Sequence, residues 1–151
     1  MKIRHVLIWC LVLFASLSLH VALGQDQKPS GIPGDEISKL VGNWSGESIC
    51  VNKEKFPSCK DEMVVYHITK VADKPNTVNL SADKIVNGKP EFMGAFDFIY
   101  DSKKQTLTSE FKNERVHLLI EFVVKGDVLE GAITSLPDKT QVRQIKVKKN
   151  K

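Results

Sequence analysis

The chain has 151 residues, of which 42% are hydrophobic, and a formal net charge of +4 at pH 7. This length fits one domain with a hydrophobic core of its own. So small a basic excess does not predict nucleic-acid binding. The lysines gathered at the C-terminal end are typical of a solvated segment, with contact to a membrane surface or a polyanion as the alternative.

Residues 1–24 have the pattern of a secretory signal peptide. Lys2 and Arg4 precede an apolar run over residues 6–19, and small residues occupy both key positions of the cleavage site Ala22-Leu23-Gly24. A retained membrane anchor is the alternative, but the run is about 14 residues and a spanning helix needs about 20. Cleavage removes two basic residues and leaves 127 residues with a net charge of +2. We therefore expect a secreted or periplasmic protein with no membrane span after cleavage.

The mature chain contains two cysteines, Cys50 and Cys59. Disulfides persist in exported proteins, and two cysteines allow one intramolecular pairing. A redox pair or a metal site is the alternative, but the spacing is not C-x-x-C and no histidine lies near in the sequence. The pattern favours a structural disulfide whose loop of about 10 residues stabilises the fold by about 2.5–3 kcal/mol.

Residues 25–41 are predicted to be an N-terminal linker that ends in a helical turn. Its first part is rich in proline and glycine, which favours an exposed, irregular backbone. The turn is expected over Glu36–Val41, with Asp35 as the residue that caps its first backbone N–H groups.

The rest of the chain, residues 42–151, reads as short β-type segments separated by turn signals, the strongest of which is Asn87-Gly88. The expected strands are Trp44–Val51, Glu62–Val71, Thr77–Val86, Phe92–Tyr100, Gln105–Phe111, Glu114–Val124, Val128–Leu136 and Thr140–Lys148. Short connections favour antiparallel neighbours. The predicted fold is all-β, an antiparallel up-and-down eight-stranded barrel, which buries one face and leaves no sheet edge. A β-sandwich is the competing architecture.

Alternation along these segments predicts which side chains face the barrel interior. The predicted inward set is Val64, Tyr66, Ile68, Val78, Leu80, Ala82, Phe92, Gly94, Phe96, Phe98, Tyr100, Leu107, Phe111, Val116, Leu118, Ile120, Phe122 and Val124. The first, seventh and eighth segments have mixed patterns, so the facing of their side chains stays open.

Gly42-Asn43-Trp44, at the start of the first strand, resembles the G-x-W signature of lipocalins (the calycin type of barrel) and, more distantly, of avidin-like barrels. The resemblance implies that Trp44 closes the narrow end of the barrel. It also implies that an arginine of the last strand, here Arg143, packs across the tryptophan ring. Trp44 is the only tryptophan after residue 24, so the tryptophans that hold biotin in avidins are absent.

An eight-stranded barrel can hold one small ligand or be filled by its own side chains. The first hypothesis is a lipocalin-like barrel that binds a small apolar molecule. Its expected lining is Tyr66, Leu80, Phe96, Phe98, Leu107, Leu118, Ile120 and Phe122. The second is a filled barrel that acts through its surface on a protein partner, as an inhibitor or interaction module, with the loop Lys53–Glu62 presented at one end.

An enzyme is the third hypothesis, and the sequence supports it least. His67 and His117 could join Asp97 or Glu121 in an acid–base set or metal site. Alternation places both histidines on the polar outer face, on strands that are not neighbours. No triad-like arrangement, phosphate-binding loop or metal-spaced histidine pair occurs. We therefore expect no catalytic residues, no cofactor and no metal.

Overall fold

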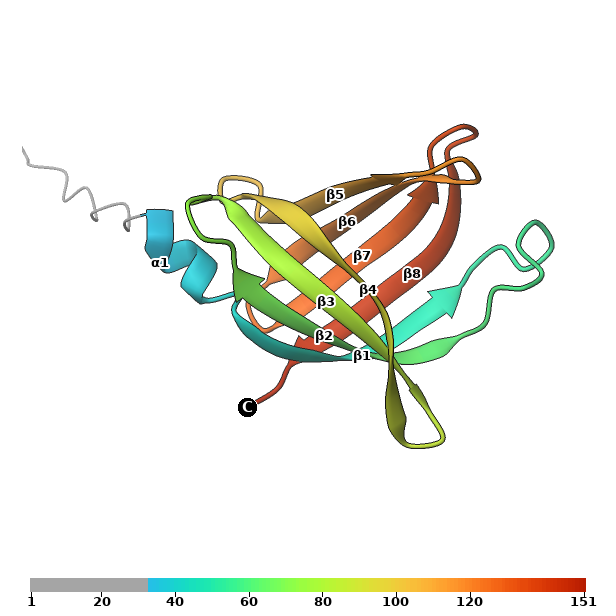
Figure 1. The fold of residues 1–151 in the computed structure, drawn as a ribbon, viewed down its shortest axis with the longest axis horizontal. Helices are drawn as coiled ribbons and strands as arrows, with labels where there is room; N and C mark the ends of the chain where they lie inside the picture. Colours follow the sequence, from blue (N-terminus) through green and yellow to red (C-terminus); the bar gives the residue numbers. More distant parts are fainter. Residues whose placement is uncertain (1–32) are drawn as a thin grey trace, which may run out of the picture. The chain divides into compact units, whose positions relative to one another are not determined.

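A computed structural model describes residues 33–151 (Figure 1). The predicted signal peptide, residues 1–24, and the first part of the linker lie outside the described residues. One short helix, α1 (Pro33–Ser38), precedes eight strands: β1 (Gly42–Cys50), β2 (Glu62–Lys70), β3 (Thr77–Val86), β4 (Lys89–Asp101), β5 (Thr106–Lys112), β6 (His117–Lys125), β7 (Val128–Ser135) and β8 (Thr140–Lys149).

The strands pair antiparallel in chain order, and β8 pairs back onto β1 to close the barrel. The prediction of an all-β, up-and-down eight-stranded barrel is therefore confirmed, and the sandwich alternative is wrong. Across residues 33–151 no helix has the length and apolar character needed to cross a membrane.

The hairpin between β3 and β4 is longer than predicted and projects from the barrel in Figure 1. Asn87 and Gly88 have φ values of 51° and 76°, which suit a two-residue turn between twisted antiparallel strands. Val86 therefore pairs directly with Lys89, and β4 starts before the predicted start at Phe92.

The starts of the helix and of the sixth strand also differ from the prediction, each by three residues, and in both cases one residue fixes the local backbone. The helix begins at Pro33, whose fixed φ suits the first helical position, so Asp35 lies within the helix and is not its cap. The sixth strand begins at His117, because the Asn113 side chain accepts hydrogen bonds from the backbone N–H groups of residues 115 and 116 and holds them in a turn.

A bulge in β4 breaks the predicted alternation. Ala82 pairs with Gly94 and Asp83 pairs with Phe92, so Met93 is an extra residue on β4. The extra residue moves Phe92 to the outer face, where its side chain is 69% exposed. The prediction that Phe92 faces inward is therefore wrong. Val116 is also exposed, because it belongs to the turn before β6.

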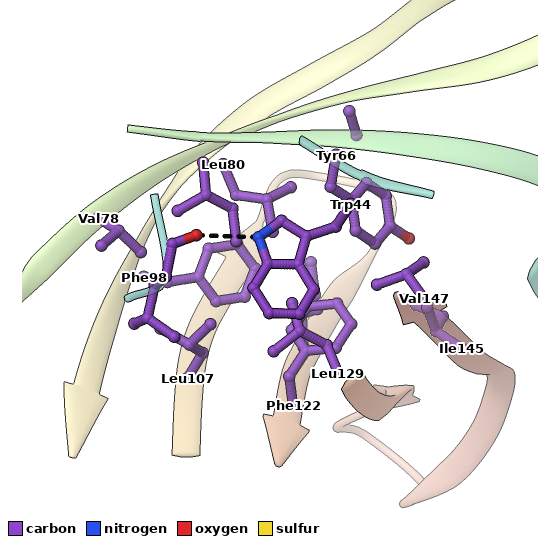
Figure 2. Close-up of a cluster of buried hydrophobic side chains, with 14 of the residues drawn as sticks. Trp44, Tyr66, Val78, Leu80, Phe98, Leu107, Phe122, Leu129, Ile145 and Val147 are labelled. Carbon is purple, nitrogen blue, oxygen red and sulfur yellow. Dashed lines mark hydrogen bonds between the residues drawn. The ribbon is translucent and has the colours of Figure 1, made fainter. Parts of the chain in front are cut away.

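One end of the barrel, where β1 begins and β8 ends, is closed by a packed apolar cluster (Figure 2). Trp44 has no solvent exposure, and its Nε1–H donates a 2.9 Å hydrogen bond to the carbonyl oxygen of Leu40. Ile37 and Leu40, from α1 and the turn after it, are also buried in this cluster. The helix therefore covers this end, which we call the closed end.

The opposite end, the open end, carries the disulfide loop between β1 and β2. Cys50 and Cys59 are bonded, with their Cα atoms 6.0 Å apart, which confirms the predicted pairing. Asp61 accepts hydrogen bonds from the backbone N–H of Cys50 and from Lys53 Nζ. The Lys53 ammonium and the Cys50 N–H lower the pKa of the Asp61 carboxyl, so it is ionised and holds the loop at neutral pH.

Replacing both Cys50 and Cys59 with alanine is expected to lower the free energy of unfolding by about 2.7 kcal/mol. The bond closes a loop of about 10 residues, and cutting it restores that loop's entropy to the unfolded chain. Urea unfolding of the double variant and of the oxidised parent measures the difference. The reduced parent should match the double variant, and equal stability of the oxidised and reduced parents would contradict this account.

Candidate functional site

The barrel interior is not filled towards its open end. A cavity of about 190 Å³ lies there. Its lining is Ser48, Glu62, Tyr66, Leu80, Ala82, Met93, Phe96, Phe98, Ile120, Phe122, Ile133, Arg143 and Ile145. A cavity of about 150 Å³ is enough to admit benzene, whereas drug-sized ligands occupy about 300–1,000 Å³. The cavity therefore suits a molecule of one or two rings.

Another hollow, of about 280 Å³, lies outside the barrel beside α1 and the turn after β2. It is lined largely by exposed residues of that turn, such as Asp73, Lys74 and Pro75. Exposed turn residues do not remove a ligand from water, so the interior cavity is the stronger candidate site.

Aromatic rings form the floor of the cavity. Phe122 packs edge-on against Tyr66, with ring centres 5.9 Å apart, and in a tilted arrangement against Phe98, with ring centres 5.7 Å apart. Phe98 and Phe122 also belong to the apolar cluster that contains Trp44. The rings of the floor thus pack against the apolar cluster of the closed end on one side, and they present an apolar surface to the cavity on the other.

One wall of the cavity lies where two neighbouring strands have the shortest stretch of backbone pairing in the barrel. Strands β4 and β5 pair only from Ile99 to Asp101 on β4, although β4 starts at Lys89. Beyond the paired stretch, Phe96 of β4 packs edge-on against Phe111 of β5, with ring centres 5.4 Å apart. Side-chain packing therefore joins the two strands where their backbones do not pair.

The structure places six of the eight predicted lining residues along this cavity: Tyr66, Leu80, Phe96, Phe98, Ile120 and Phe122. The other two do not line it. Leu107 is fully buried in the apolar cluster of the closed end, and Leu118 pairs with Phe111 nearer the start of β6. The alternation rule sorts inward from outward side chains, but it does not give their depth along the barrel axis.

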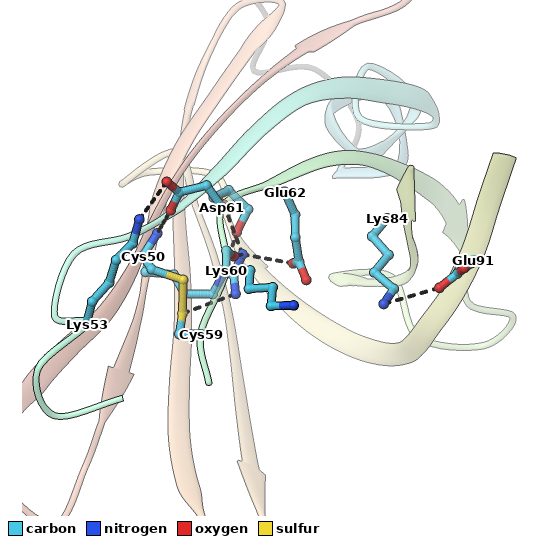
Figure 3. Close-up of polar contacts among 10 residues, drawn as sticks. Cys50, Lys53, Cys59, Lys60, Asp61, Glu62, Lys84 and Glu91 are labelled. Atoms are coloured by element: carbon cyan, nitrogen blue, oxygen red, sulfur yellow. Dashed lines mark hydrogen bonds and ion pairs between the residues drawn. A yellow bond between two sulfur atoms is a disulfide. The ribbon is translucent and has the colours of Figure 1, made fainter. Parts of the chain in front are cut away.

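Arg143 lines the cavity at its mouth and contacts the disulfide. Figure 3 shows that disulfide, Cys50–Cys59, together with Glu62. Its Nε donates to Ser48 Oγ at 2.7 Å, and its Nη1 contacts Cys59 Sγ at 3.4 Å. Its Nη2 lies 2.9 Å from Ser48 O and 2.8 Å from both Lys60 O and Glu62 Oε2. The guanidinium therefore ties the disulfide loop to β1, β2 and β8.

The expectation that Arg143 packs over Trp44 is wrong. In the antiparallel β1–β8 pair, Trp44 stands opposite Lys149, whereas Arg143 stands opposite Cys50. Arg143 and Lys149 are six positions apart on β8, which is roughly 20 Å along a strand. Lys149 takes the expected place instead: its Nζ lies 5.7 Å from the centre of the Trp44 ring and donates a 2.6 Å hydrogen bond to Lys39 O.

Comparison with known proteins bears on the fold. No family model matches the chain, and no curated protein matches it. A redesigned β-barrel has a similar structure over 76% of this chain and 95% of its own, with 12% identity and a TM-score of 0.54. The chain has a lipocalin-like fold. The siderocalin Ex-FABP, which functions through dual ligand specificities, matches over 75% of this chain and 74% of its own, with 11% identity and a TM-score of 0.37.

The histidines of this lipocalin-like barrel do not share a site. His67 lies on the outer face between Asn43, 2.8 Å from Nδ1, and Asp83, 3.0 Å from Nε2. His117 pairs with Glu110 on the neighbouring strand. Asp97 is held by Lys74 and Asn79, whose hydrogen bonds lower the pKa of its carboxyl. Within residues 33–151 no group of three histidine, cysteine or acidic side chains could hold a metal ion.

The remaining lining residues of the cavity were not predicted from the sequence: Ser48, Glu62, Ala82, Met93, Ile133, Arg143 and Ile145. Ala82 was in the predicted inward set but not in the predicted lining. Ile133 and Ile145 lie on the two C-terminal strands, whose mixed patterns leave their facing open. Met93 faces the cavity only because of the β4 bulge. Gly94 was the sequence signal for this bulge, because a glycine inside a strand often marks one. The φ of Gly94 is 153°, a conformation that favours glycine.

Proposed function

We propose that this chain is an exported, lipocalin-like binding protein that holds one small apolar molecule in its cavity. The observation that supports this proposal most directly is the cavity itself, about 190 Å³ in volume and lined mainly by apolar side chains. The closed end is densely packed, so the space is confined to the open half of the barrel. A floor of buried aromatic rings, such as Phe98 and Phe122, favours the transfer of an apolar ligand out of solvent.

Two features support export as part of this proposal. The N-terminal sequence has the pattern of a signal peptide, and the disulfide Cys50–Cys59 is a bond that oxidising compartments maintain. We propose binding and not catalysis, because the two histidines lie apart on the outer face and each is paired with a carboxylate.

The first test of the proposed function is native mass spectrometry of the protein and its Phe96→Trp variant. We expect the parent, purified without unfolding, to carry a stoichiometric adduct of small mass. The larger indole would occupy part of the cavity, and overpacking of about 1–3 kcal/mol would weaken binding roughly ten- to hundredfold. Phe92→Trp is the matched control, because Phe92 is exposed and does not line the cavity.

A bare mass in the parent, together with no uptake of small apolar probes, would contradict the binding proposal. It would favour the second candidate, a barrel that acts through its surface. One observation supports that candidate: Ile49, Val51 and Met63 are exposed at 38%, 45% and 52% beside the disulfide loop Lys53–Glu62. Ile49 and Met63 also line one shallow hollow with Asp61, so the apolar and charged groups form a continuous surface.

A further inference from the structure

We infer that the cavity selects uncharged ligands that carry a hydrogen-bond donor, and that it rejects carboxylates although an arginine stands at its mouth. This inference rests on the proposed function and names the chemical class of its ligand. It follows from the ion pair between Arg143 and Glu62 at the open end; Glu62 is labelled in Figure 3.

The guanidinium of Arg143 has no free two-pronged face for a carboxylate. A carboxylate binds arginine best through two parallel N–H groups. Every such pair of N–H groups includes Nε or Nη2, and here Nε is bonded to Ser48 while Nη2 contacts Ser48 O, Lys60 O and Glu62. The Arg143 side chain is only 14% exposed, so water does not readily replace these contacts.

Glu62 gives the mouth its selectivity. Its Oε2 is 2.8 Å from Arg143 Nη2, and its other oxygen, Oε1, has no hydrogen-bond partner within residues 33–151. Because Glu62 lines the cavity, an anionic ligand would meet a like charge, whereas a ligand hydroxyl or N–H could donate to Oε1. Such a bond to a charged acceptor is stronger than one between neutral groups.

The other groups near the mouth do not reverse this preference. Lys53 and Lys84 are paired with Asp61 and Glu91. Lys60 is exposed and does not line the cavity, so its charge is screened by water. Burial raises the pKa of the Tyr66 hydroxyl by more than the Arg143 guanidinium lowers it, so Tyr66 is neutral at physiological pH.

The ligand class that fits these walls is a small phenol, indole or cyclic alcohol. The aromatic floor formed by Phe98 and Phe122 suits a ring, and the volume of about 190 Å³ admits one or two of them. The donor group would point towards the open end, where Glu62 lies. A fatty acid would be excluded both by its charge and by its length.

The test uses three probes that share one apolar body: 4-ethylphenol, ethylbenzene and 4-ethylbenzoate at pH 7, titrated into the unmodified protein by calorimetry. We expect 4-ethylphenol to bind about tenfold more tightly than ethylbenzene, because it gains a hydrogen bond to a charged acceptor. We expect no detectable binding of 4-ethylbenzoate, which is ionised at this pH. This comparison needs no variant and therefore does not depend on how a variant folds.

Glu62→Gln adds a second arm. Removing the carboxylate charge should make binding of 4-ethylbenzoate detectable, since the like charge is gone and Arg143 loses its anionic partner, and should weaken binding of 4-ethylphenol. Glu91→Gln is the matched control. It removes a carboxylate from the same end of the barrel without altering the cavity lining, so binding of both probes should match the parent.

The outcomes separate the two proposals. If neither ethylbenzene nor 4-ethylphenol binds, the proposed function and this inference both fail. If ethylbenzene binds, but 4-ethylbenzoate binds as tightly as 4-ethylphenol, the proposed function stands and the inference is overturned. Equal affinity for ethylbenzene and 4-ethylphenol would likewise overturn the role of Glu62 as the acceptor.

Discussion

Replacing Trp44 with alanine is expected to lower the free energy of unfolding by about 3–5 kcal/mol, the range found when a large buried aromatic side chain is deleted. Trp44 has no solvent exposure and lies in the cluster that closes the barrel. The change opens a cavity there, removes the hydrogen bond to Leu40 O and removes the ring beneath Lys149. Urea unfolding followed by circular dichroism measures the loss.

Phe92→Ala is the control for this prediction. It also removes an aromatic ring from a strand, but Phe92 is 69% exposed, so the change should stay within about 0.5 kcal/mol. A loss below about 1 kcal/mol in Trp44→Ala would mean that the closed end unfolds separately from the barrel. That result would contradict the packing of Ile37 and Leu40 with the strands.

The strands could be predicted from the sequence because turn signals separate them and most of them, though not the first, seventh and eighth, alternate clearly. In β6, Ile120 and Phe122 alternate with Glu121, and this pattern alone separates buried from exposed positions. The disulfide could also be predicted, because the two cysteines after residue 24 allow only one pairing with each other. These features depend on near neighbours in the sequence, which is the information that a single chain carries.

Features that depend on register were not predicted. The β4 bulge shifts Phe92 outwards and Met93 inwards, and a one-residue shift reverses every face that precedes it. The partner of Trp44 was assigned to Arg143, although antiparallel pairing of the first and last strands puts the end of β8 beside the start of β1. Lys149 was therefore the better candidate, and the strand order alone could have shown this.

The two ends of the barrel are expected to contribute to different properties of the protein, one to stability and the other to binding. The closed end contains Trp44 and the dense part of the core, so substitutions there should change stability first. The open end contains Glu62, Arg143 and the cavity, so substitutions there should change binding first. Phe122 belongs to both, because its ring is part of the core cluster and of the cavity floor. Changes around Phe122 should therefore affect both properties.

Gly131→Ala tests that position and is expected to cost about 3 kcal/mol or more, the upper end of the overpacking range. Gly131 on β7 pairs with Phe122 on β6. A Cβ at this position would lie 2.2 Å from the carbonyl oxygen of Glu121 and 2.5 Å from Cδ1 of Phe122. The carbonyl belongs to a paired strand and cannot move alone, so the two strands must separate or the ring must turn. Thermal and urea unfolding measure the loss.

Gly126→Ala is the matched control for Gly131→Ala. Apart from its two chain neighbours, no residue places a heavy atom within 4 Å of a Cβ at Gly126, and only its φ of 61° opposes the substitution, at about 1–2 kcal/mol. A loss at Gly131 no greater than that at Gly126 would show that β6 and β7 can separate cheaply. A greater loss, accompanied by weaker binding of 4-ethylphenol, would show that the close approach at Gly131 holds the Phe122 ring in the cavity floor.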